Sequence, residues 1–291
     1  MSSRAVGALL VLVLAVSSRP AWSWGEDGHS IVAEIAQRRL APDAAAGIER
    51  LLGGRISLAS ISSWADDERS ARPETARWHY VDIPLAAQDY DPARDCAAEP
   101  GKGDCAVREL ERARREIACA PTLAARRDAL RFAVHIVGDL HQPLHAVGDA
   151  RGGNQRRVHG IIHGATCRDH CEISFDSPNL HVLWDTMLIH RATWDWGAYV
   201  ERLEAGLIRS EGFEAEAYAS REPRDWAVQS HEAARAVWNE RLVPADGRLD
   251  DGYYEAVRPI LDRQLALAGL RLARYLDEAF AVHDCGGASP H

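Results

Sequence analysis

The stretch from Phe132 to His145, FAVHIVGDLHQPLH, carries three histidines and one aspartate in a run that otherwise has the composition of a buried helix. His135 and Asp139 are four residues apart, so on a helix they lie on the same face. Pro143 removes a backbone donor and disrupts the helix, which allows His145 to turn back toward Asp139. A single buried histidine is usually a core residue with satisfied ring nitrogens. A cluster of this kind predicts a metal site if further ligands lie elsewhere in the chain.

Further candidate ligands occur in short motifs on both sides of this stretch. NLHVLWD repeats the four-residue spacing with His181 and Asp185, and SSWADDER and WHYVDIP contribute a carboxylate and an imidazole. The full set of candidate metal ligands is Trp24, His29, Asp66, His79, His135, Asp139, His145, His181 and Asp185. These ligands are too many for one tetrahedral zinc, so we expect several metal ions. Imidazoles and carboxylates without thiolates suit zinc, and coordination positions left for water would make the site hydrolytic.

The N-terminal residues have the composition of an export signal. Residues 5–16 form an unbroken apolar run that has the length of a signal-peptide core and is too short to span a bilayer. Ala21-Trp22-Ser23 offers small residues at the two positions that a signal peptidase reads. We therefore expect a signal peptide at residues 1–23, a mature catalytic domain at 24–291, location in the periplasm or outside the cell, and no membrane anchor. Trp24 would then carry a free amine, which with its own carbonyl can chelate a metal.

Charge and cysteine content limit the function further. Removal of residues 1–23 takes away two arginines and no acid, so the mature chain is more negative than the formal −9 of the whole sequence. An acidic chain does not capture nucleic acid by a general basic stripe, although bound divalent metals reverse the field locally. The six cysteines of an exported protein predict disulfides, with fifteen pairings possible and Cys167–Cys171 the most local candidate.

Hydrophobic periodicity predicts one mostly α-helical domain, without a fixed-period repeat or a glycine-rich phosphate loop. Helices are expected at residues 30–40, 42–52, 58–69, 107–119, 122–142, 193–209, 223–242 and 252–282. Pro259 predicts a kink in the last of them. We expect residues 78–84 to be extended and 85–106 to form a surface loop. Residues 147–178 are rich in glycine and predict a long loop or a β-hairpin over a site.

Together these motifs resemble the S1/P1 nucleases, exported zinc enzymes specific for single strands, whose active-site architecture is shared with zinc-dependent phospholipase C. The matching segments are WGEDGH, SSWADDER, WHYVDIP, HIVGDLHQPLH, GGN and NLHVLWD, in the order of the family and spanning Trp24 to Asp185. The resemblance implies an all-α fold, hydrolysis of single-stranded DNA and RNA to 5′-phosphate nucleotides, 3′-nucleotidase activity and three zinc ions per chain.

The resemblance also assigns roles to individual residues. It implies one zinc held by Asp66, His79, His135 and Asp139, a second held by His145, His181 and Asp185, and a third held by Trp24, His29 and Asp139. Asp139 would thus bridge two metals. Arg69 would neutralise charge on the phosphoryl oxygens, although a surface ion pair with Asp67 or Glu68 is the alternative. Tyr80 would stack on a nucleobase, Asp82 would hydrogen-bond to the base edge, and Asn154 would line the cleft.

Two other functions remain open at this point. A zinc-dependent phospholipase C would share the trinuclear site, but that family ends its last ligand pair in glutamate, whereas this chain has His181 followed by Asp185. A zinc-binding protein without catalysis would not need Arg69. No motif points to a protein partner, and we expect a monomer whose substrates are single-stranded nucleic acid and 3′-nucleotides.

Overall fold

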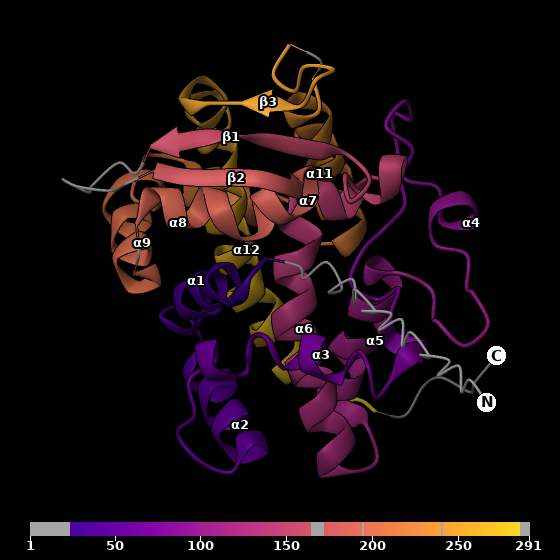
Figure 1. Ribbon diagram of the computed structural model, residues 1–291. Helices are drawn as coiled ribbons and strands as arrows, with labels where there is room; N and C mark the ends of the chain where they lie inside the picture. The colour runs from indigo at the N-terminus through magenta and orange to yellow at the C-terminus, as the bar shows by residue number, and fades with distance from the viewer. Residues whose placement is uncertain (1–23, 164–171, 194, 240, 286–291) are drawn as a thin grey trace, which may run out of the picture.

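The computed structural model describes residues 24–163, 172–193, 195–239 and 241–285, so the expected signal peptide lies outside the described residues (Figure 1). The helices are α1 Glu26–Gln37, α2 Pro42–Leu52, α3 Trp64–Glu68, α4 Pro92–Asp95, α5 Ala106–Cys119, α6 Leu123–His141, α7 Leu180–Val182, α8 Leu188–Ala192, α9 Trp196–Leu203, α10 Phe213–Ala219, α11 Pro223–Val237 and α12 Asp251–Phe280. The strands are β1 Arg157–His163, β2 Glu172–Asn179 and β3 Arg248–Leu249. The mostly α-helical fold expected from the sequence is confirmed. Within the described ranges, no helix combines the length and apolar composition needed to cross a bilayer.

Helices α6 and α12 run through the middle of the molecule and carry much of its core (Figure 1). Helix α12 is buried almost all round between Gln264 and Ala273, which is typical of a helix enclosed by others. It packs against α1, α5 and α6. Pro259 lies inside α12, and the helix continues across the position of the expected kink. The buried apolar residues form one connected cluster.

Local sequence signals explain several helix ends. Pro42 occupies the start of α2 and Gly53, with φ of 79°, ends it, as the proline-then-glycine pattern predicts. Thr122 caps α6 by accepting a hydrogen bond from the backbone N–H of Ala125 at 3.1 Å. These ends fix the length of α6, and with it the position of His135 and Asp139.

The helix expected at residues 58–69 is broken into a 3₁₀ turn, Ala59–Ile61, and the short helix α3. In a continuous α-helix the carbonyl of Ser62 would accept the N–H of Asp66. Here that N–H bonds to Ser63 at 3.1 Å, and the Ser62 carbonyl accepts the Nδ1–H of His135 at 2.7 Å. A contact with a residue far along the chain therefore overrides the local helical pattern.

Residues 78–84 are not helical, as expected, but they form no strand of a sheet within the described structure. Their backbone is held by the N–H of Val81, which donates to His145, and by the carbonyl of Tyr80, which accepts from Ala106. The expected surface loop at 85–106 is only partly correct. It contains α4, and Tyr90 and Asp95 are buried in it.

The region 147–178 contains the expected β-hairpin. Strands β1 and β2 pair antiparallel, and β3 adds to β1 in parallel, which gives the order β2-β1-β3. Figure 1 shows the sheet lying across one end of the molecule, beside α7 and α8. The hairpin leads the chain into α7, which carries His181.

Two disulfides are present among the described residues. Cys96 pairs with Cys105, nine residues away, and Cys119 at the end of α5 pairs with Cys285 after α12, 166 residues away. The local pair suggested by the sequence, Cys167–Cys171, lies outside the described residues. The long-range disulfide ties the end of the last helix to the middle of the chain.

We expect the disulfide between Cys119 and Cys285 to stabilise the fold more than the short one does. Closing a loop of this length restricts the unfolded chain by about 5 kcal/mol, against about 3 kcal/mol for the Cys96–Cys105 loop. Urea denaturation of the paired serine variants C119S/C285S and C96S/C105S measures the difference. An equal or larger loss in C96S/C105S would contradict it.

Candidate metal centre

The centre is built around the C-terminal end of α6. His135 and Asp139 lie on one face of that helix and are fully buried. Gln142 and Pro143 end the helix, and a 3₁₀ turn, Pro143–Ala146, brings His145 to the same region. The turn that the proline predicted is therefore present, and it places His145 near the helix face that carries Asp139.

Four of the candidate ligands converge in a first group formed by Asp66, His79, His135 and Asp139. Asp139 Oδ2 lies 3.0 Å from His79 Nδ1 and 3.1 Å from His135 Nε2. The two ring nitrogens are 3.1 Å apart. Asp66 Oδ1 completes the group at 3.7 Å from His79 Nδ1 and 3.6 Å from His135 Nε2.

These distances match the ligand shell of a zinc ion. Zinc bonds of about 2.0–2.2 Å in a tetrahedron place neighbouring ligand atoms about 3.3 to 3.6 Å apart, which lies inside the observed range of 3.0 to 3.7 Å. His135 donates its Nδ1–H to Ser62, so in the neutral ring Nε2 holds the lone pair that faces the group. The residues of this group fit a tetrahedral metal.

A second group contains His145, His181 and Asp185. His145 donates its Nδ1–H to the carbonyl of His79 at 2.7 Å, and His181 donates its Nδ1–H to Gly152 at 2.6 Å. A carbonyl accepts hydrogen bonds only, so each Nε2 carries a lone pair. Yet the two Nε2 atoms face each other at 3.1 Å. Burial lowers the pKa of His145, and burial together with the nearby His145 ring lowers the pKa of His181 to about 3, so protonation of either ring is disfavoured.

Asp185 completes the second group from a π-helical turn, Leu183–Met187, an irregularity that is frequent at functional sites. Its Oδ2 lies 3.5 Å from His181 Nε2, and its Oδ1 accepts a hydrogen bond from Gln142 at 2.7 Å. Burial raises the pKa of Asp185 well above its usual range, and the hydrogen bond from Gln142 opposes that rise. Asp185 Oδ2 is a buried atom without a hydrogen-bond partner in the described structure, as expected of an oxygen that binds a cation.

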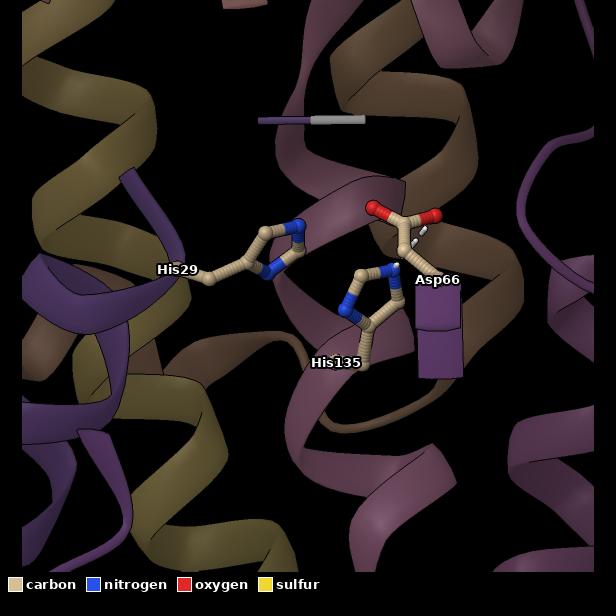
Figure 2. A group of neighbouring side chains, drawn as sticks. All are labelled: His29, Asp66 and His135. Carbon is tan, nitrogen blue, oxygen red and sulfur yellow. Dashed lines mark ion pairs between the residues drawn. The ribbon is translucent and has the colours of Figure 1, made fainter. Parts of the chain in front are cut away.

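His29 joins the centre from α1. Its Nε2 lies 3.3 Å from Asp139 Oδ1, the oxygen that points away from the first group. Figure 2 shows the His29 and His135 rings face to face beside Asp66, with ring centroids 3.9 Å apart. This close approach needs Gly138, because a Cβ at that position would lie 2.8 Å from His29 Nδ1.

Trp24 is fully buried, and the N–H of the next residue, Gly25, donates to the carbonyl of Asp185 at 2.8 Å. The start of the described chain is therefore tied to the second ligand group. The metal-binding role of the Trp24 amine and carbonyl stays a prediction.

The ionisable side chains of the centre shift one another's pKa values. Burial lowers the pKa of His79 to about 4, and the Arg69 charge contributes. Burial also acts to lower the pKa of His135, but Asp139 and Asp66 outweigh it and raise that pKa to about 9. Burial acts to raise the pKa of Asp139, but His135 and the other neighbouring histidines outweigh it and hold that pKa well below its usual range. The Asp139 carboxylate is thus ionised. Its Oδ1 lies near His29 and its Oδ2 near His79 and His135, as a ligand that bridges two metals requires.

Arg69 pairs with Asp66, a candidate metal ligand that the sequence did not offer as its partner. Its Nη1 lies 3.5 Å from Asp66 Oδ1, and the side chain is 22% exposed. Its charge also lowers the pKa of His145 and His181, after burial as the main cause. Arg69 is therefore a partly accessible cation beside both ligand groups.

The three residues expected at the base pocket, Tyr80, Asp82 and Asn154, lie in different environments. Tyr80 and Asp82 are half-buried beside His79, and burial raises the pKa of both side chains. The Asn154 side chain donates to the carbonyl of Arg151 at 2.9 Å, so it braces the loop that carries Gly152. Their contacts with a base stay predictions.

This loop is a left-handed turn. Ala150, Arg151, Gly152 and Gly153 have φ angles of 44°, 55°, 60° and 82°. Glycine suits the last two positions, and a Cβ on Gly152 would lie 2.5 Å from the carbonyl of Leu144. Ala150 and Arg151 adopt a conformation that costs L-residues free energy, and such strain concentrates at functional sites. The turn presents the Gly152 carbonyl to His181.

Sequence reasoning missed the groups that orient the ligands. Gln142 holds Asp185, and the carbonyls of Ser62, His79 and Gly152 fix the histidine tautomers. A polar residue inside the HQPLH motif is a signal that could have identified Gln142. The carbonyls leave no such signal, because every residue has one.

The sequence comparisons agree with this geometry. The family model of the S1/P1 nucleases matches residues 24–281, so the chain belongs to that family. Its relatives include nuclease P1 of Penicillium citrinum, 30% identical over 88% of this chain and 97% of that protein. Endonuclease 2 of Arabidopsis thaliana is 29% identical over 88% of this chain and 90% of that protein. Nuclease S1 of Aspergillus oryzae is 28% identical over 88% of this chain and 91% of that protein. The family consists of zinc-dependent endonucleases, which are hydrolases.

We expect Ala150→Gly to raise the free energy of unfolding by about 0.5 to 1 kcal/mol. Removing the Cβ relieves a left-handed strain of about 1 to 2 kcal/mol, and the added freedom of the unfolded chain offsets part of the gain. The control Ala46→Gly, at an exposed position inside α2, should lose about 1 kcal/mol. Urea denaturation compares the two, and a loss in both variants would show that Ala150 is not strained.

Proposed function

We propose that this chain is an exported phosphodiesterase that hydrolyses single-stranded DNA and RNA to 5′-phosphate nucleotides and also removes 3′-phosphates from nucleotides. The observation that carries the proposal is the second ligand group, in which two imidazole lone pairs face each other at 3.1 Å beside a buried carboxylate. A bound cation makes that arrangement favourable. Membership of the S1/P1 nuclease family supports zinc as the cation and nucleic acid as the substrate.

We assign three zinc ions to the centre. Asp66, His79, His135 and Asp139 would hold one, and His145, His181 and Asp185 would hold another. His29, the second oxygen of Asp139 and the amine and carbonyl of Trp24 would hold the third. The distance of 3.3 Å between His29 Nε2 and Asp139 Oδ1 supports this last site.

The metals would supply Lewis acidity and water that ionises near neutral pH. The side chains of the chain would orient these metals and the substrate. Gln142 holds the Asp185 carboxylate in place through its hydrogen bond. Arg69, a partly exposed cation 3.5 Å from Asp66, would pair with the non-bridging phosphate oxygens, on which charge grows during attack.

Substrate binding is assigned to Tyr80, Asp82 and Asn154. A base would stack on the Tyr80 ring, and Asp82 would accept a hydrogen bond from the base edge. Both contacts need an unpaired base, which explains a preference for single strands. Asn154 would act by bracing the loop beside His181.

Export is part of the proposal. A signal peptide at residues 1–23 would be removed to expose the amine of Trp24, leaving one catalytic domain from residue 24 to residue 291. The disulfides Cys96–Cys105 and Cys119–Cys285 support an oxidising compartment, the periplasm or the outside of the cell.

The central test uses mature protein that starts at Trp24. We expect close to three zinc ions per chain and cleavage of single-stranded DNA and RNA, with phosphatidylcholine left intact. Asp139→Ala should lower kcat/KM at least about a hundredfold and remove more than one zinc, because two metals lose a ligand. Asp67→Ala, an exposed carboxylate in the same motif as Asp66, is the matched control and should change neither quantity.

Three outcomes of this test are distinct. Lipid hydrolysis alone would keep the metal centre and replace the nuclease with a phospholipase C. Three zinc ions without hydrolysis of any substrate would indicate a binding protein. Little or no zinc in the mature wild-type protein would overturn the assignment of the centre.

A second test addresses His29. We expect Gly138→Ala to release about one zinc ion per chain, because the new Cβ would lie 2.8 Å from His29 Nδ1 and displace that ring. Gly206→Ala is the control, since a Cβ there meets nothing within 4 Å. Elemental analysis of both purified variants gives the zinc content. Full zinc content in Gly138→Ala would show that His29 is not needed for the third metal.

A further inference from the structure

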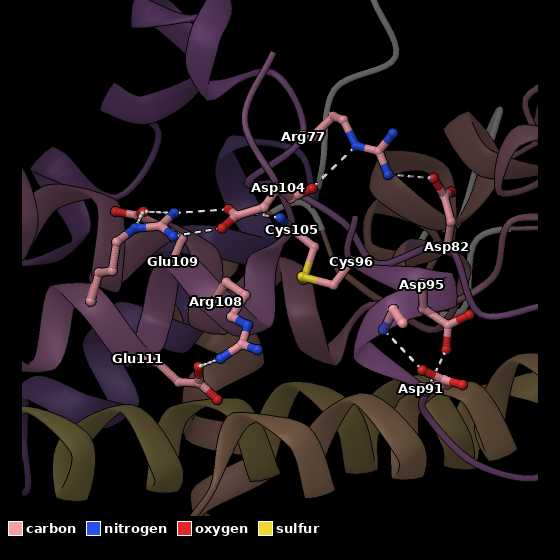
Figure 3. Close-up of a disulfide and its surroundings, with 12 residues drawn as sticks. Arg77, Asp82, Asp91, Asp95, Cys96, Asp104, Cys105, Arg108, Glu109 and Glu111 are labelled. Atoms are coloured by element: carbon pink, nitrogen blue, oxygen red, sulfur yellow. Dashed lines mark hydrogen bonds and ion pairs between the residues drawn. A yellow bond between two sulfur atoms is a disulfide. The ribbon is translucent and has the colours of Figure 1, made fainter. Parts of the chain in front are cut away.

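Arg77 connects the expected base pocket to a disulfide-closed loop, residues 96–105. Its Nη2 lies 3.4 Å from Asp82 Oδ2, and its guanidinium lies over the Tyr80 ring, 5.9 Å from the centroid. Figure 3 shows Arg77 between Asp82 and Asp104. It thus contacts both side chains to which base recognition is assigned.

The other bonds of Arg77 go to the loop. Its Nη1 binds Glu99 Oε1 at 2.7 Å, and its Nε donates to the carbonyl of Asp104 at 3.1 Å. The disulfide Cys96–Cys105 closes this loop, and both cysteines are buried. Arg77 itself is only 13% exposed on its side chain. Glu99 and the Asp104 carbonyl therefore fix the direction of the guanidinium before any ligand arrives.

Asp82 is open to a ligand on its other side. Its side chain is 40% exposed, and Arg77 contacts only Oδ2. Within the described part of the chain, no hydrogen bond reaches Oδ1. The Asp82 carboxylate is therefore held by one oxygen and offers the other as an acceptor.

We propose that Arg77, anchored by Glu99 and the Asp104 carbonyl, is a positioning residue that orients the Asp82 carboxylate toward the edge of an unpaired base. The inference rests on the proposed nuclease function and adds a substrate preference to it. A fixed carboxylate accepts a hydrogen bond from the exocyclic amino group of adenine, cytosine or guanine. Thymine and uracil have no amino group, and their only donor on that edge, N3–H, lies between two carbonyl oxygens that a carboxylate repels. The site therefore favours a base with an amino group over thymine and uracil at the bound position.

Arg112 provides a matched control for a purely structural role of Arg77. It binds Asp104 at 2.6 Å through Nη1 and lies over the Trp78 ring, so it supports the same loop from another side. Within the described residues, Arg112 forms no hydrogen bond, ion pair or ring contact with Tyr80 or Asp82. If Arg77 only held the loop, the two arginines would be equivalent.

The experiment measures kcat and KM of the mature zinc enzyme on single-stranded oligo(dA) and oligo(dT). We expect the wild type to have the lower KM for oligo(dA). Arg77→Ala should raise that KM about tenfold, as for loss of one charge-assisted hydrogen bond, with kcat within about twofold. Oligo(dT) should be affected less, Arg77→Lys should restore part of the preference, and Arg112→Ala should leave the preference intact.

A double-mutant cycle tests whether Arg77 acts through Asp82. Asp82→Asn should by itself remove the preference for oligo(dA), and adding Arg77→Ala to it should raise KM no further. Additive effects, or equal effects of Arg77→Ala and Arg112→Ala, would overturn the positioning role while leaving the nuclease intact. No cleavage of either oligonucleotide by the wild type would instead remove the proposed function, and this inference with it.

Discussion

The Nε2 atoms of His145 and His181 face each other across 3.1 Å, and each ring carries its proton on the nitrogen that points away. Two lone pairs at this distance repel unless a cation lies between them. Three features of the surrounding fold hold them there: α6 ends at a proline, a left-handed turn with strain at Ala150 and Arg151 positions Gly152, and a π-helical turn positions Asp185. A bound metal would offset the free energy that these irregular segments cost.

Helix α6 has two functions, and its histidines divide between them. His135 faces the metal centre, whereas His141, about 240° further round the helix, faces the core. His141 donates Nδ1–H to the carbonyl of Val137 and accepts from the buried Arg271 through Nε2 at 2.9 Å. Gln264 of α12 donates to the His141 carbonyl at 2.8 Å. A satisfied polar network thus holds the end of α6 on α12, which fixes the position of Asp139.

Much of the centre could be predicted from the sequence. The four-residue spacing of His135 and Asp139 puts them on one helix face whatever the rest of the fold does, and Pro143 ends that helix by its own chemistry. Helix boundaries were less predictable where a distant group competed for a backbone bond. The break after Ser62 arises because its carbonyl binds His135, a partner 73 residues away that no local pattern contains. The pairing of Cys119 with Cys285 could not be predicted either, because the two cysteines are 166 residues apart.

The sequence alone determined the ligand types, their spacing, the mostly helical fold and the resemblance to the nucleases, because periodicity and side-chain chemistry are local properties. Tertiary structure decided which ligands share a metal-sized space, which tautomer each histidine adopts and that Arg69 pairs with Asp66. It also decided that Arg77 reaches across from the disulfide-closed loop to Asp82. These features depend on distances between segments far apart in the chain, and such distances are set only when the whole core packs.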